Sequence, residues 1–307
     1  MLQQLFSWFM SIIAFFMSLF GLGGAKTDPV TPAPVGEPEI VYLSEQTLSY
    51  GADKDQTLDL LLPAGKSGPA GLVLFIHGGA WVTGSKESYL PEAIRYQALG
   101  YVTATINYRY LGNGVMPSDE LDDITAALRV IKAACAQKGV SVSRTVLVGS
   151  SSGAHLALLY AYTRASEAPV TPVAVISSSA PTDFTDPAFL KSGAGELLAG
   201  SIGINTDLLA TLMQTGIAQT FVPTLTTLSP AKQVTRTSVP TLMAHGKNDT
   251  IVPYSNAERL DAALTEKGVR HDFVSFPNSG HALVNDPDCT LRFQTLTAQY
   301  IATYLGA

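Results

Sequence analysis

A serine framed by two glycines is the first feature of this sequence that could do chemistry. It lies in the motif Gly149-Ser150-Ser151-Ser152-Gly153, between an apolar run and a stretch of helical periodicity. A sharp strand-to-helix turn exposes a serine hydroxyl to an approaching carbonyl, and the glycines let the neighbouring backbone come close to that turn. Only Ser151 has a glycine two residues away on each side. The motif therefore predicts Ser151 as a nucleophile.

A second glycine-rich segment, His-Gly-Gly-Ala-Trp at residues 77–81, lies upstream and directly follows another apolar run. The tetrahedral intermediate of acyl transfer carries an oxyanion that needs fixed N–H donors. Glycines can turn their amides inward where a side chain would obstruct. We therefore expect the amides of Gly78, Gly79 and Ser152 to form an oxyanion hole, and Trp81 to contribute to substrate binding.

A carboxylate and an imidazole complete this set of residues. Asp249 follows the apolar run Thr241–Ala244, and His281 follows the predicted strand His271–Phe276. We expect His281 to take the proton of Ser151 as general base, and Asp249 to orient the imidazole. The order Ser-Asp-His along the chain is that of α/β-hydrolases and differs from the orders of chymotrypsin and subtilisin.

The four remaining histidines fit the role of base less well. His77 belongs to the glycine-rich segment and is expected to brace it. His155 lies on the helix after the serine motif, where packing is its expected role. His245 ends a strand shortly before the predicted acid, and His271 begins a strand, at the end of that strand that we expect to lie remote from the site.

Apolar runs that alternate with helical patterns must position these residues. Strands are predicted at Thr57–Leu62, Leu72–Ile76, Tyr101–Asn107, Thr145–Val148, Val173–Ser177, Thr241–Ala244 and His271–Phe276. Helices are predicted at Ser118–Gln137, Gly153–Arg164, Ser255–Lys267 and Thr290–Tyr304. Continuous apolar runs are typical of strands buried on both faces. The pattern predicts an α/β fold with a doubly wound, mostly parallel sheet and helices on both faces.

One segment breaks this alternation of strands and helices. Residues 183–234 separate two predicted strands and are too many for a simple crossover. Their leucines suggest short helices, at Leu197, Leu198, Leu208, Leu209 and Leu212. We expect a small cap insertion over the active-site face; the alternative is an excursion that leads away from the site.

The N-terminal segment differs from the rest of the chain. Residues 5–22 are almost wholly apolar, and a helix of that length reaches roughly 27 Å, close to the thickness of a bilayer core. Small residues follow, although no basic residue precedes the run. We expect residues 1–25 to be a signal peptide or N-terminal membrane anchor, residues 26–39 a proline-rich linker, and residues 40–307 the catalytic domain. This order predicts a protein that is secreted, periplasmic or membrane-anchored and facing outward.

Composition excludes several classes of partner. The chain has 307 residues, 14% of them charged, a net charge of −6 and no Lys/Arg cluster, so nucleic acid is not an expected ligand. Cys135 and Cys289 lie outside any zinc-binding pattern and either form one disulfide or stay unpaired. No metal or organic cofactor is expected, and the expected partner is a small-molecule ester.

Together the motifs resemble the esterase/lipase families of the α/β-hydrolase superfamily that carry an HGGxW-type oxyanion loop. These families include hormone-sensitive-lipase-like and feruloyl-esterase-like bacterial enzymes. The resemblance runs from about Val41 to the C-terminus and includes Asn107–Tyr110 and Pro181–Asp183. It departs at Ser152, where many relatives have alanine or glycine and where a hydroxyl could alter the polarity of the site.

The resemblance implies a serine hydrolase that cleaves short-chain or aryl carboxylic esters through an acyl-enzyme, with Ser151, His281 and Asp249 as the triad. Two other classes of function stay open at this point. One is an amidase, formamidase or peptidase on the same fold. The other is a non-catalytic binding domain, which an intact set of nucleophile, base, acid and amide donors disfavours.

Overall fold

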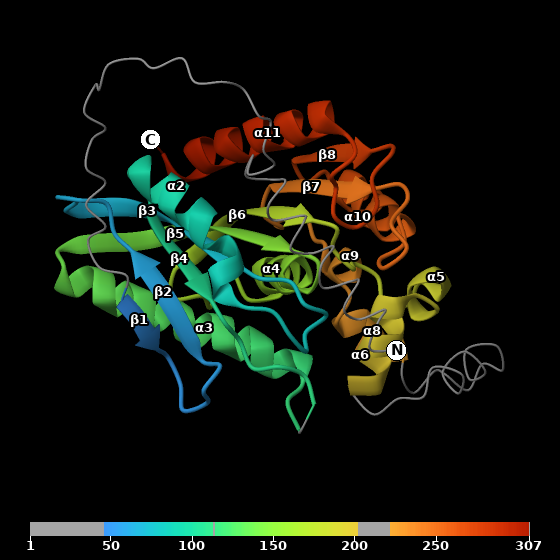
Figure 1. Ribbon diagram of the computed structural model, residues 1–307, viewed down its shortest axis with the longest axis horizontal. Coiled ribbons are helices and arrows are strands. Elements are labelled where there is room, and N and C mark those ends of the chain that lie inside the picture. The colour runs from blue at the N-terminus through green and yellow to red at the C-terminus, as the bar shows by residue number, and fades with distance from the viewer. Residues whose placement is uncertain (1–45, 113, 202–221, 307) are drawn as a thin grey trace, which may run out of the picture.

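The computed structural model describes residues 46–112, 114–201 and 222–306 (Figure 1). The predicted signal or anchor segment at 1–25 and the linker at 26–39 lie outside these residues, as do Leu208, Leu209 and Leu212 of the predicted insertion. Within the described ranges, no helix combines the length and apolar character needed to cross a membrane.

A single eight-stranded sheet forms the centre of the fold, with strand order β1-β2-β4-β3-β5-β6-β7-β8. Only β2 runs antiparallel to its neighbours β1 and β4. The strands are β1 (Gln46–Ser49), β2 (Thr57–Leu61), β3 (Gly68–Ile76), β4 (Val102–Ile106), β5 (Val140–Ser150), β6 (Thr171–Ser178), β7 (Thr241–Gly246) and β8 (His271–Phe276). This topology confirms the predicted mostly parallel α/β sheet.

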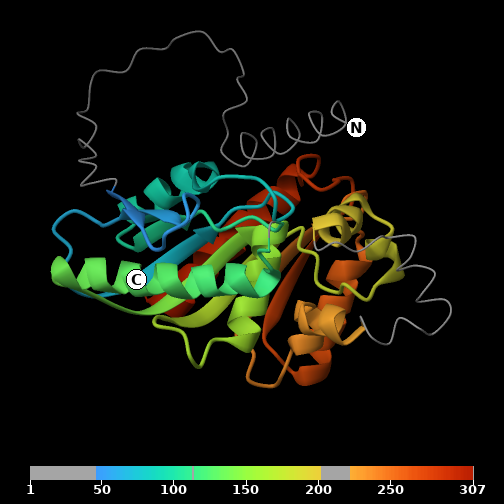
Figure 2. The same ribbon diagram turned by 90° about the horizontal axis from the view of Figure 1, so that it is seen from below.

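Two layers of helices enclose the sheet (Figures 1 and 2). Alternate side chains of β3 show why both layers are needed, since Leu74 and Ile76 join the core of one face while Val73 and Phe75 join the other. One layer contains α3 (Pro117–Gln137), α4 (Ser152–Thr163) and α10 (Ser255–Lys267); the opposite layer contains the 3-10 turn η1 (Lys86–Tyr89), α2 (Leu90–Ala98) and α11 (Pro287–Leu305).

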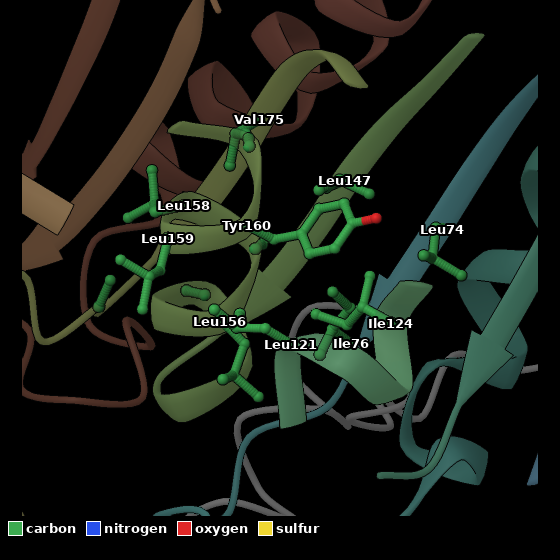
Figure 3. Packing of buried hydrophobic residues seen from close by; sticks show 14 of the residues in the cluster. Leu74, Ile76, Leu121, Ile124, Leu147, Leu156, Leu158, Leu159, Tyr160 and Val175 are labelled. Atoms are coloured by element: carbon green, nitrogen blue, oxygen red, sulfur yellow. The ribbon is translucent and has the colours of Figure 1, made fainter. Parts of the chain in front are cut away.

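Helix α4, which directly follows Ser151, is buried along most of its length. Every residue from Ser152 to Ala161 is buried, and a helix that is apolar all round belongs inside a protein. Figure 3 shows Leu156, Leu159 and Tyr160 of this helix among side chains from α3 and from the central strands. The N-terminus of α4 is therefore held rigidly at the carboxyl end of β5.

Several elements differ from the sequence prediction. Strand β5 begins at Val140 rather than Thr145, because its first residues alternate buried valine with exposed serine and lack a continuous apolar run. Strand β3 begins at Gly68, in a Gly-Pro segment that resembles a turn. Strand β1 and helix α2 were not predicted; β1 has four residues at the sheet edge, where little burial leaves a weak signal.

The described parts of the predicted insertion contain the short helices α5 (Pro187–Leu190), α6 (Gly193–Ser201), α8 (Val222–Thr227) and α9 (Pro230–Gln233). Buried Asp183 anchors this segment to α10 by an ion pair with Arg259 at 3.1 Å, and it also pairs with Lys232 of α9 at 3.2 Å. Asn256 of α10 also accepts the backbone N–H groups of Thr182 and Asp183. Whether the segment covers the active site stays a prediction.

The two cysteines do not pair. Cys135 is buried in α3, Cys289 is partly exposed near the start of α11, and both are free thiols.

Candidate active site

Ser151 occupies the sharp turn between β5 and α4. Its backbone has φ 52° and ψ −123°, a left-handed φ that is uncommon for a residue with a side chain and costs conformational energy. Two close approaches require the flanking glycines. A Cβ on Gly149 would overlap the backbone of Gly153, and a Cβ on Gly153 would overlap the carbonyl oxygens of Ile76 and His77. Three backbone segments thus pack tightly against one another at the predicted serine motif.

The structure brings the three predicted triad residues together at the carboxyl ends of β5, β7 and β8. The Nε2 atom of His281 lies 3.0 Å from the Oγ atom of Ser151. The Nδ1 atom of His281 lies 2.7 Å from the Oδ2 atom of Asp249. Since a carboxylate only accepts hydrogen bonds, Nδ1 carries a proton and Nε2 is left to accept the proton of the serine hydroxyl.

Asp249 is an ionised, buried acid. Its Oδ1 atom accepts the backbone N–H groups of Ile251 and Val252, each at 2.9 Å. Burial alone would raise the pKa of Asp249, but the charge of His281 and the hydrogen bonds from His245 and His281 outweigh burial and hold the pKa well below its usual value. The carboxylate can therefore orient His281 across the whole neutral range.

A separate network shapes the loop that carries His281. The buried carboxylate of Asp286 accepts the backbone and side-chain N–H groups of Asn278, at 3.0 and 2.8 Å, and the hydroxyl of Ser279 at 2.6 Å. Ser179, after β6, donates its hydroxyl to the carbonyl oxygen of His281 at 2.8 Å. Sequence reasoning did not single out Ser179 or Asp286, because neither belongs to a motif and both act through contacts between distant segments.

The glycine-rich loop after β3 lies directly against the nucleophile. A Cβ added to Gly78 would stand 3.2 Å from the Cβ of Ser151. Among the described residues, the amides of Gly78 and Gly79 donate no backbone hydrogen bond. The amide of Ser152 is at the first position of α4, where helix N–H groups lack an acceptor within the helix. The predicted oxyanion hole thus has unpaired donors beside Ser151.

The segment after β4 holds this loop in place. Tyr108 donates its hydroxyl to the carbonyl of His77 at 2.8 Å, and Tyr110 donates its hydroxyl to the carbonyl of Gly84 at 2.7 Å. The backbone N–H of Leu111 donates to the carbonyl of Trp81 at 2.9 Å. These contacts give a physical role to the Asn107–Tyr110 segment, which fixes both ends of the loop, while the adjacent Leu111 fixes its middle.

Trp81 does not lie where the sequence suggested. Its side chain is 1% exposed and its ring packs edge-on against His155 and Phe184, at 5.3 and 5.8 Å between centroids. A side chain buried to that degree is not available to touch a substrate. The expected substrate-binding role is therefore corrected: the indole fastens the glycine-rich loop to α4.

The other histidines are buried, except one. His155 is packed as expected, and burial lowers its pKa to about 4. Burial likewise lowers the pKa of His77 to about 4, and its ring stacks on Tyr108 at 4.4 Å. Both rings are therefore neutral at physiological pH. His271 lies at the start of β8, the opposite end of that strand from His281.

Ser152 also differs from expectation. Its side chain is 1% exposed, and its hydroxyl faces the hydroxyl of Tyr108 at 3.4 Å. The extra hydroxyl therefore points into the interior and leaves the polarity of the site's surface unchanged.

In the described ranges, no group of three or more His, Cys, Asp or Glu side chains is arranged to hold a metal ion.

Comparison with known proteins places this geometry among esterases. Probable isoprenylcysteine alpha-carbonyl methylesterase ICMEL1 of Oryza sativa subsp. japonica is 25% identical over 255 residues, which cover 79% of this chain and 58% of that protein. Esterase LipC of Mycobacterium tuberculosis is 25% identical over 286 residues, which cover 81% of this chain and 64% of that protein. The chain thus spans less than two thirds of the length of these curated relatives.

A solved structure shows the same fold. It is that of the thermophilic esterase Est2 of Thermogutta terrifontis with propionate bound, with a TM-score of 0.65 and 21% identity, and it covers 88% of this chain and 98% of that one. The model of the BD-FAE family matches residues 58–264, more than half of the chain. The resemblance to esterase-type α/β-hydrolases is therefore confirmed, and the chain belongs to the BD-FAE family of α/β-hydrolase carboxylesterases.

Proposed function

We propose that this protein is a serine hydrolase that cleaves carboxylic esters through an acyl-enzyme. One observation carries the proposal. An unbroken line of hydrogen bonds runs from Asp249 through His281 to Ser151, which lies against the loop of Gly78 and Gly79, whose amides donate no backbone hydrogen bond among the described residues. A nucleophile, a base, an acid and oxyanion donors within one small volume are what acyl transfer needs.

Each group has one task in the reaction. The Oγ atom of Ser151 attacks the ester carbonyl while its proton moves to Nε2 of His281. The amides of Gly78, Gly79 and Ser152 stabilise the negative charge that develops on the carbonyl oxygen. His281 then gives the proton to the leaving alcohol, and a water molecule, deprotonated by the same imidazole, hydrolyses the acyl-enzyme.

The proposed substrates are esters with a short acyl chain or an aryl group. The thermophilic esterase of the same fold that was solved with propionate bound supports a short acyl group, although its identity to this chain is only 21%. We also propose that residues 183–234 form a cap beside the site. Supporting contacts lie at its two ends, where Phe184 packs on Trp81 and the carbonyl of Leu228 bonds to His155 at 2.8 Å.

Export from the cytoplasm is a further part of the proposal. It is supported by the apolar run at residues 5–22 and by the prolines of the linker, Pro29, Pro32, Pro34 and Pro38. Fractionation of cells that express the full chain would test it. Enzyme found in the cytosol as soluble full-length protein would overturn the export proposal and leave the esterase proposal unaffected.

The reaction is tested with p-nitrophenyl esters of acetate, propionate, butyrate and octanoate, and with the matching anilides. The natural chain should hydrolyse the short esters and react with a fluorophosphonate probe. Ser151→Ala should lower kcat at least ~10⁴-fold and abolish labelling. Ser143→Ala is the matched control, because Ser143 is exposed at the opposite end of the same strand. Equal activity in both variants would refute the proposal, and faster cleavage of anilides would redirect it to an amidase.

A further inference from the structure

The carboxylate of Asp249 contacts two imidazoles rather than one. Its Oδ2 atom lies 2.7 Å from Nδ1 of His281 and 3.1 Å from Nε2 of His245. Its Oδ1 atom already accepts the two backbone N–H groups of Ile251 and Val252. An ionised carboxylate offers about four acceptor positions, so this one is fully occupied.

The tautomer of His245 follows from its two neighbours. Besides Asp249, its Nε2 atom lies 2.9 Å from the carbonyl oxygen of Val252. Both neighbours are acceptors only, so Nε2 must carry a proton, which it donates to the carbonyl of Val252 while Oδ2 of Asp249 lies 3.1 Å away. The N–H group of Val252 in turn donates to Oδ1 of Asp249. His245, Val252 and Asp249 thus form a closed ring of close polar contacts.

His245 is rigidly placed. It is the fifth residue of β7, which pairs with β6 on one side and β8 on the other. Its side chain is 2% exposed and that of Asp249 is 0% exposed. The ring of Tyr254 packs edge-on against the imidazole at 5.9 Å between centroids. A donor held this firmly restricts the rotation of the carboxylate that it contacts.

We infer that His245 is a positioning residue of the triad, which holds Oδ2 of Asp249 in the direction that orients His281. This inference rests on the proposed function. Without the second donor, two backbone amides on Oδ1 and one imidazole on Oδ2 leave the carboxylate freer to turn, and the imidazole of His281 loses its fixed direction toward Ser151. His245 does not touch the reacting atoms.

Two polar variants of His245 distinguish a role of its N–H donor from a role of its side-chain volume in packing. In His245→Gln the amide nitrogen can reach the place of Nε2, whereas in His245→Asn it reaches only the place of Nδ1. We expect kcat of the Gln variant to stay within about threefold of the natural chain, and kcat of the Asn variant to fall roughly 10- to 100-fold with little change in KM. If the Asn variant does not fold, His245→Phe removes the donor at similar volume and takes its place.

His271→Asn is the matched control, because His271 also contacts a carboxylate, that of Asp261 at 3.2 Å, but at the far end of β8. It should leave kcat unchanged. Folding of every variant is checked by thermal unfolding. A strongly downfield proton resonance from the Nδ1–H group of His281, bonded to Asp249, should be present in the natural chain and the Gln variant and lost or broadened in the Asn variant.

The outcomes distinguish this inference from the proposed function. A natural chain that neither hydrolyses esters nor reacts with a fluorophosphonate would refute the function. An active natural chain with equal kcat in the folded Gln and Asn variants, whether both high or both low, would overturn the role of His245 alone. An unchanged downfield resonance in the Asn variant would do the same.

Discussion

The indole N–H of Trp81 donates to the Nδ1 atom of His155 at 3.1 Å, and both side chains are buried. Since Nδ1 accepts here, Nε2 of His155 carries the ring proton, which it donates to the carbonyl of Leu228 at 2.8 Å. One neutral histidine therefore joins the glycine-rich loop, helix α4 and the inserted segment. The sequence predicted only a packing role for His155, whereas the structure shows that it links three parts of the site.

Replacing this histidine should damage both stability and activity. In His155→Leu, the indole N–H of Trp81 and the carbonyl of Leu228 lose their partners inside the protein. The free energy of unfolding, measured by urea unfolding, should fall by about 2–6 kcal/mol, because each of the two unpaired buried groups costs about 1–3 kcal/mol. We expect kcat to fall as well, because the loop that carries Gly78 and Gly79 is less firmly held. His271→Leu, at a partly exposed position, should lower the free energy of unfolding by less than about 1 kcal/mol. Equal losses of stability in His155→Leu and His271→Leu would contradict the linking role of His155.

The crowded serine turn predicts an intolerance to a single methyl group. Gly153→Ala would push a Cβ into the backbone carbonyls of Ile76 and His77, which cannot move without displacing the oxyanion loop. We expect kcat/KM for p-nitrophenyl acetate to fall at least ~100-fold and stability to fall by about 1–3 kcal/mol. Gly200→Ala is the control, since a Cβ there meets no atom within 4 Å and α6 would gain a better helix former. A Gly153→Ala enzyme of normal activity would show that the turn is looser than described.

The four donors around Asp249 predict a large effect of an isosteric change. In Asp249→Asn, one side of the amide must present N–H groups to other donors, either to the backbone amides of Ile251 and Val252 or to the two imidazoles. His281 would then favour the wrong tautomer, and kcat should fall roughly 10³–10⁴-fold. Steady-state kinetics check this, with circular dichroism to confirm folding. A loss below tenfold would mean that the carboxylate is dispensable.

A buried acid in α3 predicts that the stability of the natural chain falls as pH rises. Glu120 of α3 is 0% exposed, and neither carboxylate oxygen has a hydrogen-bond partner among the described residues. Burial, and then the charges of Asp123 and Asp119, raise the pKa of Glu120 well above its usual value. Above about pH 4.5 the unfolded chain releases this proton while the folded chain keeps it, so stability is lost as pH rises.

Glu120→Gln removes this titration, and its advantage over the natural chain in the free energy of unfolding should therefore grow from pH 5 to pH 8. Urea unfolding at several pH values measures the difference. Glu167→Gln, at an exposed glutamate, should show no such trend. A difference between Glu120→Gln and the natural chain that is constant with pH would mean that the carboxyl ionises in the folded protein.

Much of this molecule follows from local sequence alone. The serine turn was predictable because its glycines, its preceding apolar strand and its following helix are neighbours along the chain. The buried strands were predictable where both faces are covered, as in Leu72–Ile76, and their starts were missed where one face is exposed, as at Val140. A local cause holds for Gly79, since its φ is 138° and a Cβ there would overlap the carbonyl of Thr83, whereas Gly78 is crowded by Ser150 and Ser151 of a distant segment.

Contacts between distant segments were decided only by the tertiary structure. That His245 shares the carboxylate of Asp249, that Asp286 shapes the loop of His281, and that Trp81 turns inward to His155 depend on which elements the folded sheet and helices bring together. Patterns of residue type along a chain report burial and local geometry. The hydrogen-bond partner of a buried polar group depends on how the whole chain packs, because every donor and acceptor that the fold brings near competes for that group.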